Sequence, residues 1–104
     1  MAETVFEAGS VAVLTAANDL WPRTSDSSAG YYPSRQVSGI KVSNPTASKY
    51  YRIQIGDVIV YEVVTGATAP TSTIVDRVNI ITGGKQLKLV TDDAGTNFKV
   101  FLYF

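Results

Sequence analysis

The sequence predicts an all-β fold, a small antiparallel β-sandwich or barrel of about six to eight strands. Short segments rich in valine, isoleucine, leucine and aromatic residues recur along the 104 residues, and turn-forming residues separate them. None of these segments shows a sustained helical period. The last of them, residues 98–104 (FKVFLYF), alternates as a strand up to the final residue. At this length we expect a single β domain over residues 1–104.

Two short strands are expected at the start of the chain. Residues 3–7 form the first, and the turn at residues 8–10 (AGS) leads to the second at residues 11–17 (VAVLTAA). A helical turn is the alternative for residues 11–17, because periodicity does not distinguish strand from helix over so short an apolar run. Valine, leucine and threonine, in a chain this rich in β signals, favour the strand.

Residues 18–35 are predicted to form one long loop, since two prolines, a glycine and a cluster of serines and aspartates break any regular period. Long loops are usually functional or disordered, and this one carries the only tryptophan, Trp21, and the adjacent Tyr31 and Tyr32. These aromatic side chains suit three roles. They plug one end of the sandwich or barrel, they contact a protein partner, or they stack on sugar rings.

The middle of the chain carries the strongest β signals. Residues 37–43 alternate as a strand, which ends at a proline-containing turn. Residues 50–64 follow, with Gly56 and Asp57 at their centre. We interpret this dipeptide as a hairpin turn with glycine first, as type II′ turns prefer; the alternative is a bulge at Gly56 that bends one long strand. In the hairpin the opposed pairs are Ile55 with Val58, Ile53 with Val60, and Tyr51 with Glu62.

The C-terminal third is predicted to be a three-stranded meander. A strand at residues 73–82 and its return at residues 85–91 are joined by Gly83 and Gly84, which both accept positive φ. The turn at residues 92–96 then leads into the final strand.

The final strand is apolar on both faces. Phe98, Val100, Leu102 and Phe104 share the face expected to line the core, and Lys99, Phe101 and Tyr103 share the other. A strand of this kind is usually covered on both faces. The second cover comes either from a loop of this chain or from another subunit. The candidate interface residues are those of the outer face and of the long loop, namely Trp21, Tyr31, Tyr32, Phe101 and Tyr103.

The composition argues against an enzyme, and we expect no catalytic residue, cofactor or bound metal. The chain has no cysteine and no histidine, which removes thiolate ligands, the commonest metal ligand and the commonest general base. Nine basic residues balance nine acidic ones without any basic run, so nucleic-acid binding is not expected. We find no signal peptide and no apolar run of the ~20 residues that span a bilayer, so the protein is expected to be made in a cytoplasm.

Two groups of acidic residues are candidates for other sites. Residues 92–97 (DDAGTN) offer oxygen ligands for calcium, but they lack the spacing of an EF-hand loop, so a plain turn is favoured. Asp57, Glu62 and Asp76 are candidates for the carboxylate pair of a glycosidase. Nothing in their spacing demands that chemistry, so we favour the interpretation that these carboxylates lie in solvent or at a sheet edge. Asp76 interrupts an apolar strand face, which places that strand near a sheet edge.

In overall style the chain resembles small all-β virion proteins of tailed bacteriophages, of the capsid decoration or cement type. The resemblance lies in the short chain without cysteine or histidine, the Ser/Thr/Ala/Gly-rich loop at residues 65–72, and strands up to the last residue. It rests on no diagnostic motif and assigns no residue a role. It implies a non-enzymatic virion protein that forms a homo-oligomer or clamps neighbouring capsid subunits through apolar β interfaces. The alternative function is a carbohydrate- or receptor-binding β module, in a phage tail or fibre for example, that uses the loop aromatics.

Overall fold

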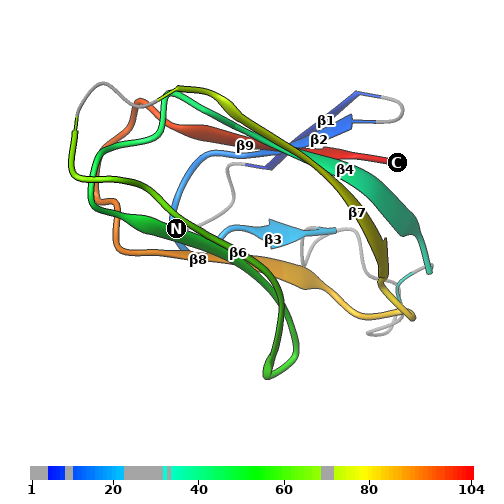
Figure 1. Cartoon of the computed structure of the whole chain (residues 1–104). Coiled ribbons are helices and arrows are strands. Elements are labelled where there is room, and N and C mark those ends of the chain that lie inside the picture. The colour runs from blue at the N-terminus through cyan, green and yellow to red at the C-terminus, as the bar shows by residue number, and fades with distance from the viewer. Residues whose placement is uncertain (1–4, 9–10, 23–31, 33, 69–71) are drawn as a thin grey trace.

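The computed structural model describes residues 5–8, 11–22, 32, 34–68 and 72–104, and over these residues the chain forms nine strands and no helix. All strand pairs are antiparallel, and the strands form two sheets that face each other as layers (Figure 1). The predicted all-β class is therefore confirmed, and of its two forms the chain adopts the sandwich.

Five strands make up one sheet and four the other. The five-stranded sheet has the order β1-β2-β9-β4-β7, with β1 at Val5–Ala8, β2 at Val11–Leu14, β9 at Lys99–Tyr103, β4 at Gln36–Ser43 and β7 at Ile74–Ile81. The four-stranded sheet has the order β3-β8-β5-β6, with β3 at Leu20–Trp21, β8 at Leu87–Thr91, β5 at Tyr50–Ile55 and β6 at Val58–Val64.

The hydrophobic core lies between the sheets, and β9 contributes to its centre. Phe98, Val100 and Leu102 are almost fully buried, as the alternation along the final strand predicts. Phe104 packs against the same core and is partly exposed. The other core side chains come from both sheets and include Leu14, Ile40, Val42, Tyr51, Ile53, Leu87 and Leu89.

The N-terminal region forms two strands, as expected, with changed bounds. Strand β1 ends at Ala8, and residues 1–4 and 9–10 lie outside the described part of the chain. Strand β2 stops at Leu14 because the backbone then turns around a buried carboxylate. Oδ2 of Asp19 accepts hydrogen bonds from the amides of Thr15, at 2.8 Å, and Ala16, at 2.9 Å. The helical alternative for residues 11–17 is therefore wrong for residues 11–14, which form β2.

The hairpin at Gly56 is confirmed, but its predicted register is only partly right. Ile55 pairs with Val58, and Gly56 has a φ of 58°. Further from the turn the register shifts by one residue, because β6 carries a bulge at Val60. Ile53 therefore pairs with Tyr61, not Val60, and Tyr51 with Val63, not Glu62.

The three C-terminal strands do not form a meander. Strand β7 pairs with β4, β8 with β3 and β5, and β9 with β2 and β4. Gly83 and Gly84 do have positive φ, of 63° and 80°, but a turn sets only its own backbone geometry. The end of β7 is tied to the start of β4, since the amide of Arg35 donates to Oγ1 of Thr82 at 2.8 Å. The chain therefore crosses between the sheets after β7 and again after β8.

Candidate functional site

The outer face of the five-stranded sheet carries a row of apolar side chains centred on β9. Tyr103 pairs with Val11 of β2 on one side, and Phe101 pairs with Val13 of the same strand. Opposed residues of antiparallel strands share a face, so these four side chains gather on the side away from the core. We call Val11, Val13, Phe101 and Tyr103 the β9 patch.

The two aromatic rings of the β9 patch lie along the strand with near-parallel planes. The ring centroids of Phe101 and Tyr103 are 6.4 Å apart, with an angle of 20° between the planes. On the β4 side, Lys41 pairs with Phe101 and places its ammonium nitrogen 4.8 Å from that ring's centroid. This geometry gives a cation–π contact. The patch is therefore apolar at its centre with a positive charge at its border.

Phe101 and Tyr103 are both partly exposed although each has neighbours on two sides. Among the described residues, no strand is layered over this face of the sheet (Figure 1). Within the described part of the chain, the core covers the inner face of β9, and no segment covers its outer face.

Trp21 lies in the core and not on an exposed loop. It belongs to the two-residue strand β3, where it pairs with Leu87 of β8. Its side chain is 2% exposed, and its ring centroid is 4.5 Å from that of Phe104. The guanidinium carbon of Arg35 lies 4.5 Å from the Phe104 centroid and 5.7 Å from that of Trp21. Among the three roles considered for Trp21, this position fits the plug at one end of the sandwich.

The described structure places one of the two loop tyrosines. Tyr31 lies outside the described residues, and Tyr32 is partly exposed. Tyr32 lines a shallow groove of about 380 Å³ together with Leu20, Gly56, Gly84, Lys85, Gln86 and Lys88. Among the described residues, the groove offers a ligand one aromatic ring, that of Tyr32, and two lysines.

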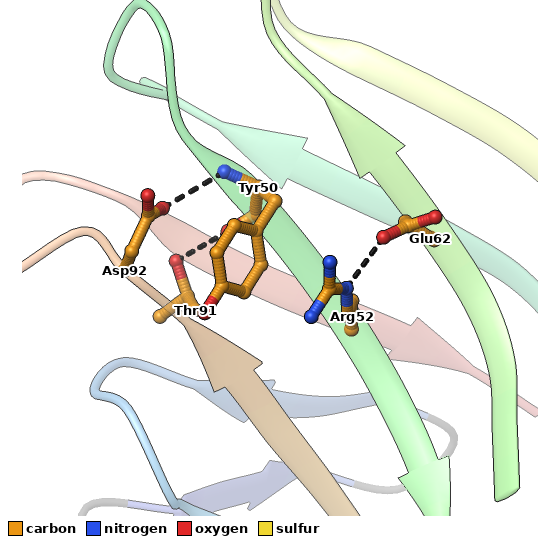
Figure 2. Close-up of polar contacts among 5 residues, drawn as sticks. All are labelled: Tyr50, Arg52, Glu62, Thr91 and Asp92. Carbon is orange, nitrogen blue, oxygen red and sulfur yellow. Dashed lines mark hydrogen bonds and ion pairs between the residues drawn. The ribbon is translucent and has the colours of Figure 1, made fainter.

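The outer face of the four-stranded sheet is polar where β5, β6 and β8 meet, and its side chains bind each other (Figure 2). Arg52 forms an ion pair with Glu62, which raises the pKa of Arg52, and its guanidinium carbon lies 4.0 Å from the Tyr50 ring centroid. Beside them, the Tyr50 amide donates to Oδ1 of Asp92 at 2.9 Å, and the Thr91 hydroxyl donates to the Tyr50 carbonyl at 2.6 Å. This arrangement fixes the start of β5 against β8.

The acidic turn after β8 is held to the core by a buried hydrogen-bond network. The Tyr51 hydroxyl donates to Oδ2 of Asp93 at 2.6 Å and accepts from the Thr46 amide at 2.8 Å. The Gly95 amide donates to Oδ1 of Asp93 at 2.9 Å. Burial alone would raise the pKa of Asp93, but these hydrogen bonds and nearby Lys49 lower it below its ordinary value of 3.8. Burial and the Asp93 hydrogen bond raise the pKa of Tyr51 to about 12.

The three acids considered for glycosidase chemistry are not brought together. Asp57 lies in the exposed β5–β6 turn, and Glu62 is engaged by Arg52. Asp76 faces inward on the edge strand β7, where Oδ2 accepts a hydrogen bond from the Tyr61 hydroxyl at 2.6 Å. The predicted edge position is thus confirmed. Over the described residues, no three acidic side chains are grouped as metal ligands would be.

Comparisons of the chain with protein-family models, with curated proteins and with solved structures find no match. The described residues include no helix with the length and apolarity needed to cross a membrane. The class that the structure defines is a small antiparallel β-sandwich, and any function has to be argued from its surfaces.

Proposed function

We propose that this chain is a non-enzymatic structural protein whose β9 patch binds another protein during assembly. The proposal rests on the position of Phe101 and Tyr103, side by side on a sheet face over which no described segment is layered. A contiguous, partly exposed apolar patch of this kind is typical of interaction sites. Its burial contributes roughly 25 cal/mol per Å² before the costs of association are subtracted.

The two outer faces of the sandwich differ in a way that supports this choice. On the four-stranded sheet, Arg52 and Glu62 satisfy each other, and the exposed apolar side chains of β6 lie at the sheet edge. On the five-stranded sheet, the rings of Phe101 and Tyr103 have apolar neighbours on β2, and the ammonium group of Lys41 flanks the Phe101 ring. An apolar centre with a charged border is the usual composition of a protein–protein interface.

A pair of charge substitutions on β9 tests the β9 patch directly. Phe101→Asp and Tyr103→Asp should each abolish binding to the partner protein while circular dichroism and the unfolding midpoint stay close to those of the parent. Gln54→Asp is the matched control, because Gln54 is a partly exposed residue of β5 in the other sheet. Variants that are folded and still bind would contradict the proposal, and so would loss of binding by the control.

We further propose that the setting of this assembly is a virion, with the chain decorating or cementing a capsid. The support is the resemblance in style to small phage virion proteins, together with the all-β fold. Mass spectrometry of gradient-purified particles from the native source should detect the chain at a fixed ratio to the coat protein. Its absence from such particles would contradict the virion setting and leave the β9 patch to be tested separately.

The carbohydrate-binding alternative has less support, because Trp21 is 2% exposed and cannot stack on a sugar ring in this conformation. Tyr32 at its groove is the one loop aromatic left with described exposure. A glycan array gives the test: a specific binder whose signal is lost in Tyr32→Ala would favour this alternative over the protein-binding proposal.

A further inference from the structure

Three cations of the five-stranded sheet border the β9 patch. They are Lys41 on β4, Arg77 on β7 and Lys99 on β9. Lys41 pairs with Phe101 across the strands, and Lys99 lies two residues before Phe101 on the same strand. Side chains at opposed positions, and at every second position of one strand, share a face. Lys41 and Lys99 therefore lie on the outer face of the sheet, on two sides of the Phe101 ring.

Arg77 extends this cationic border toward Tyr103. It is exposed and lies opposite Gly39, which pairs with Tyr103 on its other side. A Cβ atom at Gly39 would lie 3.6 Å from Cδ2 of Tyr103, so the tyrosine ring lies against this glycine. Because Gly39 has no side chain, none stands between Tyr103 and Arg77 along this row of the sheet.

No acidic side chain compensates these cations on the described part of the outer face. The acid of this sheet whose side chain is described is Asp76, which faces inward and accepts the hydrogen bond of the Tyr61 hydroxyl. Among the described residues, none of the three cations forms an ion pair, whereas Arg52 on the other sheet is paired with Glu62. The outer face of the five-stranded sheet therefore combines an apolar centre with unpaired positive charge.

We propose that the partner of the β9 patch is a protein with an acidic surface, whose carboxylates face Lys41, Arg77 and Lys99. This partner chemistry rests on the proposed function of the patch. The face is divided, since Val11 and Val13 on the β2 side are apolar and the β4 and β7 side is cationic. Apolar side chains of the partner thus lie over β2 and β9, and its carboxylates lie toward β4 and β7. Complementary charges at such a border raise the association rate and fix the orientation of the partner.

A protein fits this face better than a single-stranded nucleic acid does. Aromatic rings beside cations also bind single strands, whose bases stack on the open faces of the rings. Here the ammonium nitrogen of Lys41 lies 4.8 Å from the Phe101 ring centroid, and the Tyr103 ring lies against Gly39. Each ring therefore has one face already occupied, and the neighbouring valines of β2 offer aliphatic surface that suits apolar side chains.

Backbone amide chemical shifts of the isotope-labelled chain test the chemistry of the partner with two synthetic peptides. One peptide consists of leucine and glutamate, and the other has lysine in place of each glutamate. The acidic peptide should shift the amides of Phe101 and Tyr103, and added salt should weaken its binding, because salt screens charges at a rim. Equally tight binding of the basic peptide would overturn this inference and leave the β9 patch as an apolar binding surface. Absence of shifts with the acidic peptide at millimolar concentration would also overturn it.

Two double variants with the same change in net charge test the residues. Arg77→Glu combined with Lys99→Glu should weaken binding of the acidic peptide at least about tenfold, because each reversal replaces an attraction by a repulsion. Lys85→Glu combined with Lys88→Glu is the control, since these lysines lie at and before β8 of the other sheet. The control should weaken binding by less than about threefold, because salt screens charges at that distance. Equal losses in the two double variants would overturn the proposal.

Two further measurements separate this proposal from its alternatives. Phe101→Asp should abolish the shifts caused by the acidic peptide, and undiminished binding by this variant would contradict the proposed function of the β9 patch itself. A single-stranded oligothymidylate should bind the parent more weakly than the acidic peptide does. Tighter binding of the oligonucleotide, lost in the Arg77→Glu and Lys99→Glu double variant, would overturn the acidic protein in favour of a nucleic acid.

Discussion

Removal of one hydroxyl group from the core, by Tyr51→Phe, should destabilise the sandwich by about 2–4 kcal/mol. The hydroxyl makes two hydrogen bonds, one to the carboxylate of Asp93 and one from the amide of Thr46. Tyr51 is 1% exposed and Asp93 4% exposed, so water cannot easily replace the lost donor. A hydrogen bond to a charged group contributes about 1.5–3 kcal/mol, and the neutral bond from the more exposed Thr46 contributes about 1 kcal/mol or less.

The effect of Tyr51→Phe should also depend on pH. The pKa of Asp93 is lowered in the folded state, so its carboxylate contributes stability at neutral pH, and this contribution is lost as the pH falls through the folded-state pKa. Once Asp93 is protonated, the variant no longer leaves a charge without its donor. The difference in unfolding free energy between parent and variant should therefore be largest above about pH 4 and shrink below it.

Urea unfolding gives the measurement, with the fluorescence of Trp21 as the probe because it is the only tryptophan and is buried. The matched control is Tyr50→Phe, which removes a hydroxyl from the adjacent, partly exposed tyrosine and should change stability by less than about 0.5 kcal/mol. A decrease in unfolding free energy of less than about 0.5 kcal/mol for Tyr51→Phe, or the same decrease at pH 7 and pH 2, would refute the reasoning.

Three further predictions concern other parts of the fold. Trp21→Ala should lower the free energy of unfolding by about 3–5 kcal/mol, because it removes the ring that packs on Phe104. Thermal unfolding gives the measurement, and a decrease of less than about 1 kcal/mol would argue against the position of Trp21 in the core. Stability should fall as the pH rises beyond about 10, since the pKa values of Tyr51 and Tyr61 are raised in the folded state, and Tyr61→Phe should flatten that fall in urea titrations. Gly56→Ala should cost about 1 kcal/mol from its φ of 58°, since the space around it is open, and an unchanged urea midpoint would contradict this.

Local patterns in the sequence predict the strands well, and the pairing between strands poorly. The alternation along residues 98–104 correctly separates the core face of β9 from the face with Phe101 and Tyr103. The glycine pair after β7 correctly predicts positive φ and still misleads about topology. Which strand becomes a neighbour depends on contacts across the whole chain, which no turn encodes.

The candidate site is predictable to a similar extent. The outer face of β9 follows from period-2 alternation, but its flanking valines at positions 11 and 13 become part of it only through the pairing with β2. Trp21 is misplaced on a loop because β3 is two residues long, too short for any periodic signal. Asp76 correctly predicts that β7 lies at a sheet edge, but the sequence does not predict that Val75 and Ile81 stay exposed on its outer face, because apolar residues on both faces of a strand predict burial.

The central position of β9 has a consequence for synthesis on the ribosome. Strands β2 and β4 emerge long before β9, which pairs with both of them. During that interval each presents an unpaired edge, and chaperones or self-association have their best opportunity there. The five-stranded sheet therefore closes in a late step that inserts one strand between two others. Contacts of such long sequence separation give folding times of milliseconds to seconds.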